Sequence, residues 1–377
     1  MASEDVLDIA QLVAAIPGDN PAGEDLREDF SPDSIYRQIR AARSEAREAE
    51  RRVVFDDEED VAAGAAANWR PILELAPQAL SERSKDLEVT ALLIEALVRE
   101  HGFPGLRDGY RLARELVEQF WDNLYPLPDE DDGMFARVAP LAGLNGNEGE
   151  GLLIRPIAKV IITEGTDFGP FSSLDYKMAN DLEAEPDAEK RARRIAQPGT
   201  VTKQMFEKAV SATSAEFFKN LLEDIQQCRD EFQALSDLLD EKCGVDESGY
   251  SQAPPSSSIR EVLEECHEAV VAISRHLLEV EEESSEDALE TTGGNGGGIS
   301  TQVHTREEAF RALLRAADFF KRTEPHSPVS YALEQAVSWG RMSLPDLLKE
   351  LIADETARSD VFKRVGIQPP EEEETTY

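Results

Sequence analysis

Histidine and cysteine, the residues that most often build metal sites and nucleophilic centres, are scarce in this sequence. The chain of 377 residues contains five histidines and three cysteines. An odd number of widely spaced cysteines is typical of reduced thiols and not of a disulfide framework. Cys266 and His267 are adjacent and His276 follows on the same expected helix, but neighbours on a helix point in different directions. We therefore expect no metal site and no cofactor.

Motifs that bind phosphate or support catalysis are also missing. The glycine-rich stretches 146–151 and 293–298 are not followed by the Lys-Ser or Lys-Thr pair of a phosphate-binding loop. Residues 167–169 read Asp-Phe-Gly without the other kinase motifs, and residues 129–133 resemble a calcium loop only superficially. We therefore expect no enzymatic activity. An enzyme is kept as a third hypothesis beside the two given at the end of this section. It would require a polar pocket that holds ionisable groups with strongly shifted pKa values.

Positive charge and long apolar runs are in short supply as well. The 39 Lys and Arg residues against 77 Asp and Glu residues give a net charge of −38. Such a field repels phosphate backbones and anionic lipid headgroups, which argues against nucleic acid as a partner. No run approaches the roughly 18–20 apolar residues that span a bilayer, and the start of the sequence lacks the pattern of a secretory signal. We expect a cytoplasmic protein without direct membrane insertion.

What the sequence does contain is apolar residues at helical spacing, in a chain long enough for two or three domains. Asn68 is predicted to cap a helix that has Pro71 in its first turn. A second helix over 86–100 should end at Gly102, which suits the left-handed cap position, and a third should cover 106–124. Short connections between such helices imply antiparallel packing, so residues 1–150 are predicted to form an N-terminal helical domain.

The remaining residues are predicted to form a middle domain and a small C-terminal domain. The apolar run 152–162 favours an extended segment or a small edge hairpin, although Pro156 argues against a central strand. Helices are predicted over 202–242 and 259–282. The predicted division is 151–280 for the middle helical domain, 281–302 for a flexible acidic and glycine-rich linker, 303–368 for the C-terminal domain and 369–377 for an acidic tail. The fold class is mostly α, with multi-domain helical bundles and a small helical C-terminal oligomerisation domain.

Several short motifs in the N-terminal domain occur in one order. They are Pro21, Gly23, Glu24, Asp25 and Leu26; Trp69; Ser84, Lys85, Asp86 and Leu87; His101, Gly102 and Phe103; Trp121; and Pro126. In this order they resemble the N-terminal domain of the TssA/ImpA family of the bacterial type VI secretion system. The resemblance implies a structural assembly protein and not an enzyme. Large aromatic residues on apolar helix faces usually pack, so we expect Trp69, Phe103 and Trp121 to be core residues before partner contacts. The 21–26 segment is read as a turn that locks this domain, with a binding loop as the alternative.

A second set of residues, near the end of the chain, resembles the short, baseplate-type C-terminal ending of the same family. They are Pro325, His326, Ser327, Pro328 and Tyr331, followed by Trp339, Arg341 and Met342. The resemblance implies a homo-oligomeric ring with type VI baseplate, inner tube and sheath proteins as partners. These eight residues are the candidate oligomer or partner interface. His326 and Arg341 are its expected polar contacts, with capping or salt-bridge roles as the alternative.

Physical reasoning supports parts of this resemblance. Ser327 can cap a helix with Pro328 at its first position, and helices are predicted over 305–321, 327–340 and 344–352. A stripe on the second of these helices is formed by Val329, Leu333, Ala336 and Val337. A domain of about 65 residues has little core of its own, so burial between copies would stabilise it. The competing hypothesis is a soluble adaptor or chaperone that holds secretion-machine subunits before assembly and then leaves.

Overall fold

A computed structural model of the chain describes residues 2–53, 68–128, 133–147, 149–165, 169–246 and 248–290, and in the C-terminal part residues 310, 313, 314, 316, 317, 320, 321, 328–342 and 347. The chain forms two compact units, residues 1–291 and residues 292–377. The described residues form helices and no strand, which confirms the predicted mostly α fold class. No helix among these residues has the length and apolar character needed to cross a membrane.

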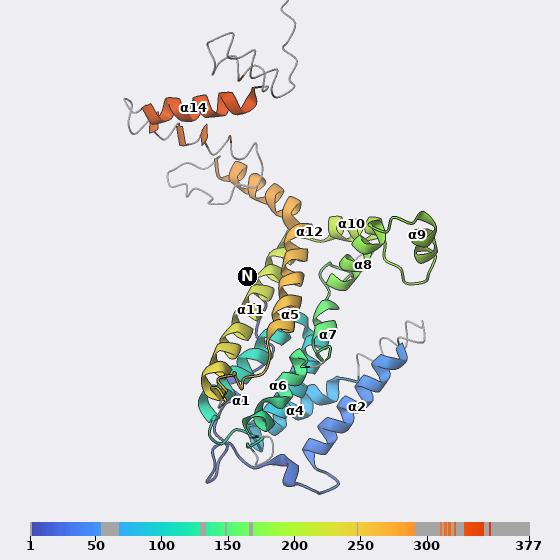
Figure 1. Ribbon diagram of the computed structural model, residues 1–377, viewed down its shortest axis with the longest axis vertical. Coiled ribbons are helices and arrows are strands. Elements are labelled where there is room, and N and C mark those ends of the chain that lie inside the picture. Colours follow the sequence, from blue (N-terminus) through green and yellow to red (C-terminus); the bar gives the residue numbers. More distant parts are fainter. Residues whose placement is uncertain are drawn as a thin grey trace, which may run out of the picture. The chain divides into compact units, whose positions relative to one another are not determined.

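The first unit is built around the long helix α5, Leu87–Phe120. Before it come α1 (Ile9–Leu12), a short 3-10 helix (Leu26–Glu28), α2 (Ile35–Val53) and α4 (Arg70–Glu82). After it come α6 (Met134–Asn145), α7 (Ile154–Ala158), α8 (Ser173–Glu183), α9 (Ala188–Ile195), α10 (Lys203–Ala212), α11 (Ala215–Cys243) and α12 (Ser257–Glu290). Figure 1 shows α11 running alongside α5 and α12 running alongside α11.

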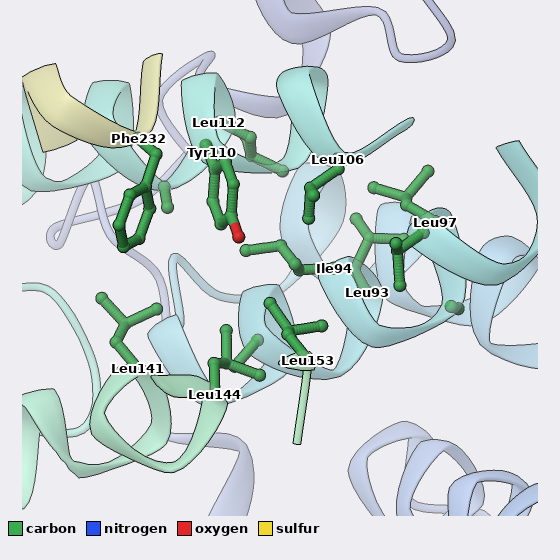
Figure 2. Packing of buried hydrophobic residues seen from close by; sticks show 14 of the residues in the cluster. Leu93, Ile94, Leu97, Leu106, Tyr110, Leu112, Leu141, Leu144, Leu153 and Phe232 are labelled. Carbon is green, nitrogen blue, oxygen red and sulfur yellow. The ribbon is translucent and has the colours of Figure 1, made fainter. Parts of the chain in front are cut away.

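The core of this unit contains residues from both sides of position 150, where the sequence predicts a domain boundary. Helix α11 packs along α5, and α4 and α6 also contact α5. Figure 2 shows Leu141 and Leu144 of α6 directed towards Ile94 and Tyr110 of α5. The rings of Tyr110 and Phe232, which come from α5 and α11, lie 4.8 Å apart between centroids. One apolar cluster therefore joins helices on both sides of residue 150.

Helices α4 and α5 follow the predicted pattern with local differences. The N-cap residue of α4 is Trp69, one residue after the predicted cap Asn68. The two predicted helices 86–100 and 106–124 are joined in α5, which is interrupted at Gly102 with φ 58° and ψ −136°. Gly102 thus has the predicted positive φ, and its non-helical backbone separates two helical segments that meet at a kink, close to the predicted division.

The predicted extended segment over 152–162 is wrong, because residues 154–158 form helix α7. Leu153 and Ile157 are fully buried and lie four residues apart, which is a helical and not an extended spacing. Pro156 is tolerated because it lies in the first turn of this short helix. In this segment, the nearest approach to sheet structure is a single antiparallel bridge between Ile161 and Ser172.

The predicted helix over 202–242 is two helices, α10 and α11, separated at Thr213 and Ser214. The backbone of Thr213 is extended, and the side chain of Ser214 caps α11 by accepting a hydrogen bond from the amide of Phe217. Serine at this position satisfies one of the amides that a helix start leaves without a partner. The break therefore follows from a capping residue and not from a loss of apolar spacing.

The boundary between the two units in the sequence falls within the predicted linker, after residue 291. Helix α12 continues to Glu290, so its last residues cover the first part of the 281–302 segment. Residues 291–302, the acidic tail 369–377, and all of the predicted third C-terminal helix except Leu347 lie outside the described residues. The predicted domain bounds themselves stay predictions.

In the second unit the structure describes helix α14, Pro328–Arg341, close to the predicted 327–340. The buried positions along α14 are Ser330 and Val337, whereas Val329 is 40% exposed. The buried side thus differs from the predicted stripe, which included Val329. A Cβ atom at Gly340 would lie 2.4 Å from the ring of Phe310, so the helix approaches that ring where it has no side chain.

Candidate functional site

Three family-motif segments of the first unit meet at the start of α5. The segment around Gly23 forms an antiparallel bridge with Ser84, in which the amide of Glu24 donates to the carbonyl of Arg83 at 3.1 Å. The amide of Lys85 donates to the carbonyl of Ala22 at 2.8 Å. Gly23 has φ +80°, and a Cβ atom there would lie 2.0 Å from the Arg83 carbonyl oxygen. This close approach explains why glycine occupies the position.

On its other side the 84–87 segment lies beside Tyr125. The amide of Leu87 donates to the carbonyl of Tyr125 at 2.7 Å, and the amide of Tyr125 donates to the carbonyl of Lys85 at 3.0 Å. The peptide bond between Tyr125 and Pro126 is cis. Three segments that are far apart in the sequence, 21–27, 84–87 and 123–126, are thus hydrogen-bonded side by side. We refer to them as the motif hub.

Asp86 is the fully buried carboxylate of the motif hub. It caps α5 by accepting hydrogen bonds from the amides of Glu88 and Val89 at 2.8 and 3.1 Å. Its other oxygen binds the guanidinium of Arg27 at 2.8 Å, and Arg27 also binds Asp25 and Glu88, each at 2.9 Å. Burial raises the pKa of Asp86, and Arg27 opposes that shift. The carboxylate therefore fixes the start of α5 and the 21–27 segment to each other.

Lys85 is the fully buried cation of the motif hub. Its ammonium donates to the carbonyl of Leu12 at 2.7 Å and to that of Leu80 at 2.6 Å, which are at or near the C-terminal ends of α1 and α4. It also lies 5.7 Å from the centroid of the Phe120 ring. A cation is stabilised at helix C-termini because the last carbonyls have no partner within the helix. Burial nevertheless lowers the pKa of Lys85 to about 8.

The remaining family-motif residues lie outside this hub, most of them in the apolar core of the first unit. Trp69 and Phe103 are fully buried, which confirms that they are core residues, and Trp121 is partly buried against the same core. The guanidinium of buried Arg137 donates to the carbonyl of Trp121 at 2.6 Å and lies 4.9 Å from its ring. His101 is exposed, so the structure does not bring it to the hub.

Sequence reasoning did not find two further charged clusters, both centred on α5. In the first, Glu50 of α2 accepts from the indole nitrogen of Trp69 at 2.9 Å and from Arg99 at 2.5 Å, while Arg99 stacks 4.0 Å from the Trp69 ring. Nearby, buried Glu95 binds Arg43 at 2.8 Å. The available signal was Glu95 itself, a charged residue inside an otherwise apolar helical run.

The second missed cluster fixes the start of the chain. Arg107 and Asp108 of α5 and Asp224 of α11 are all buried. Arg107 donates to Asp108 at 2.8 Å and to the carbonyl of Ser3 at 2.9 Å, and Asp224 accepts from the amide and hydroxyl of Ser3 at 2.8 and 2.6 Å. Asp108 also accepts from the amide of Leu7 at 3.0 Å. These charges therefore bind the first residues of the chain to two core helices.

The candidate interface residues of the second unit are only partly described. Pro328 begins α14, Tyr331 is 63% exposed and Trp339 is 36% exposed. Arg341 is the last residue of α14, and Met342 follows it half-buried. Pro325, His326 and Ser327 lie outside the described residues. The role of all eight residues as an interface stays a prediction.

The described side chains form no group of three or more that could hold a metal ion. Each charged residue of the motif hub, and each of Arg107, Asp108 and Asp224, binds backbone groups or an opposite charge. Lys85, whose pKa burial lowers, has no exposed surface through which a substrate could reach it. The first unit is therefore a helical bundle in which the buried charges join distant segments of the chain.

Comparisons with known proteins then show what the chain is similar to. Residues 13–146 match the sequence model described as ImpA, N-terminal, type VI secretion system. The chain is 24% identical over 368 residues to type VI secretion system component TssA1 of Pseudomonas aeruginosa, which covers 95% of this chain and 98% of that relative. A solved N-terminal domain of the type VI TssA component from Burkholderia cenocepacia, which includes the conserved ImpA N-terminal region, superposes with a TM-score of 0.57. It is 25% identical and covers 72% of this chain and 94% of that one. Residues 13–146 thus match the ImpA N-terminal family of the type VI secretion system, and the chain is similar to TssA components over most of its length.

Proposed function

We propose that the chain is a structural, non-catalytic assembly component of a bacterial type VI secretion machine, in which residues 303–368 form a homo-oligomeric ring. The observation that carries the proposal is the likeness to TssA1 over 95% of this chain, because it extends beyond the N-terminal domain into the C-terminal unit. The ring would act in the cytoplasm and contact baseplate, inner tube and sheath subunits.

The second unit supports self-association through its exposed aromatic residues. Tyr331 and Trp339 lie on α14 with 63% and 36% of their surfaces exposed. Tyrosine and tryptophan contribute large contact areas at interfaces and often carry most of the binding energy. In a unit this small, burial between copies would add apolar contacts that one copy cannot make alone.

The non-catalytic role is supported by what the buried charges do. Lys85 and Asp86 bind the ends of helices, and Arg107 binds backbone carbonyls of the first residues. Functional ionisable groups usually line a cleft where they meet a substrate. Here they join segments of the chain to each other, as expected for a protein that presents rigid surfaces to partners.

Sedimentation velocity of the full chain and of a fragment covering residues 1–290 tests the ring. The fragment corresponds to the first compact unit. We expect the full chain to form one discrete large species at micromolar concentration and the fragment to be monomeric or weakly associated. A full chain that stays monomeric and binds only free machine subunits would instead support the adaptor or chaperone hypothesis.

A further inference from the structure

A groove of about 920 Å³ lies among α7, α8 and α12, away from the motif hub. Ile154, Met178 and Ala272 contribute to its apolar wall, and Met178 is 50% exposed. A large apolar side chain that is half exposed beside a groove indicates a surface suited to contact another protein. The groove has room for a side chain or a short segment of another protein.

The groove carries an excess of negative charge. Five carboxylates line it against two cations, which gives a local balance of −3. The carboxylates are Glu150, Asp181, Glu261, Glu265 and Glu268, and the cations are Arg155 and Lys177. Lys177 is already bound to Glu265 at 3.0 Å. An occupant of this groove should therefore combine an apolar side chain with flanking positive charge.

Helix α9 has these properties and buries none of its eight residues. It contains four basic residues and one acidic residue, a balance of +3 in a chain whose net charge is −38. Its Ile195 is 48% exposed. Arg191 and Arg194 take part in no ion pair in the described part of the chain, whereas Arg193 binds Glu189 at 3.2 Å. Figure 1 shows α9 standing away from the α5, α11 and α12 bundle.

We propose that the groove among α7, α8 and α12 binds α9 of a second copy of this chain. The balances of −3 and +3 are complementary, and α9 with its length of about 12 Å would place Ile195 against the apolar wall beside Met178. The occupant comes from another copy because only residues 184–187 separate α8 from α9, and the structure holds α9 outside the groove. Donor and acceptor are different surfaces, so each copy can offer both.

This inference does not rest on the proposed ring, because every residue that carries it lies within residues 1–291. The contact is expected to be weak, since exposed charges gain little energy per pair and are screened by salt. A covalent trap is therefore the suitable test. The three native cysteines are buried. Cys266 lines the groove, so the acceptor chain without Met178→Cys measures its contribution to the background.

The experiment mixes two full-length variants, Ile195→Cys and Met178→Cys, that carry different affinity tags, under mild oxidation. We expect a disulfide dimer that contains both tags. Reversing the charge of α9 by Arg191→Glu with Arg194→Glu in the first chain should lower its yield at least tenfold. Adding Glu261→Arg with Glu268→Arg to the second chain should restore the yield, because the two charge patterns are then exchanged.

The matched control replaces Met178→Cys by Gln233→Cys, which is exposed on α11 and does not line the groove. This pair sets the background of random collision. The proposal is overturned if the Ile195 and Met178 pair cross-links no better than this control. It is equally overturned if charge reversal leaves the yield unchanged. Circular dichroism of each variant verifies that the helices are retained.

Discussion

At the scale of single residues, Lys85 shows how burial and hydrogen bonding oppose each other. Its ammonium is fully buried and donates to the carbonyls of Leu12 and Leu80. The hydrogen bonds hold the amine in place in either protonation state, but the charge is costly to bury. The pKa of Lys85 in the folded protein is therefore about 8, below the ordinary value of 10.5 that applies to the unfolded chain.

The first prediction concerns how Lys85 makes stability depend on pH. Between about pH 8 and 10.5 the unfolded state binds the proton and the folded state does not, so the free energy of unfolding rises with pH. Below pH 8 both states are protonated and the contribution is flat. Relative to Lys85→Met, the parent should gain at most roughly 3 kcal/mol over this window. Urea unfolding of both proteins at pH 7, 8, 9 and 10 measures it, and the comparison cancels tyrosine and thiol titration. A constant difference across these pH values would contradict the prediction.

The second prediction concerns Gly23, which combines a positive φ with a close approach to the Arg83 carbonyl. Gly23→Ala should destabilise the first unit by roughly 1–3 kcal/mol because alanine is strained at this φ and its Cβ would displace the bridge. Gly143→Ala is the matched control, since Gly143 lies in α6 and a Cβ there would have no neighbour closer than 3.8 Å. That change should be neutral or stabilising. Thermal unfolding of the two variants distinguishes them, and equal melting temperatures would contradict the argument.

At the scale of elements, α5 organises the first unit because it contacts the motif hub, Trp69 and the start of the chain. Its N-terminus is held by Asp86, its middle by Glu95 and its second half by Arg107 and Asp108. Each of these charges binds a segment distant in sequence. The long helix thus fixes the positions of elements that are too short or too polar to be stable alone.

The third prediction is that Asp224 of α11 holds the first residues of the chain against α5. Asp224→Ala removes both hydrogen bonds to Ser3 and leaves the Arg107 guanidinium without one of its neighbouring carboxylates. We expect a loss of roughly 3 kcal/mol, as for breaking a buried charge pair. Hydrogen exchange of the amides of residues 3–7 should accelerate, whereas α12 should change little. Asp230→Ala, an exposed change on the same helix, should alter neither measurement.

Much of this arrangement follows from sequence patterns, and the parts that do not have identifiable physical causes. Apolar spacing predicted helices close to α4, α5 and α14 because periodicity is a local property. The same reasoning gave the wrong structure for residues 152–162, where a short run of β-branched residues fits a buried helix as well as a strand. Periodicity does not report contacts between distant segments. Such contacts bring the three family-motif segments together in the motif hub and form the charged clusters on α5.

At the scale of the whole molecule, charge and self-association act against each other. A net charge of −38 makes copies repel one another, and the repulsion reaches about 8 Å at physiological salt and about 30 Å at 0.01 M. An assembly of such chains needs apolar contacts or local patches of positive charge where copies meet. In the described residues, α14 offers exposed aromatic side chains and α9 offers a local excess of positive charge.

The last prediction separates an interface role for α14 from a core role. Trp339 is 36% exposed and Val337 is 3% exposed on the same helix. If Trp339 contacts another copy, Trp339→Ala should abolish the large species in sedimentation while the helical circular dichroism signal is retained. Val337→Ala should instead lower the thermal stability of the second unit by roughly 1 kcal/mol through loss of buried apolar surface, and affect assembly only in proportion. Should Trp339→Ala reduce helicity and assembly together, as a core substitution would, Trp339 is part of the unit's own core and the surface through which copies meet must lie elsewhere.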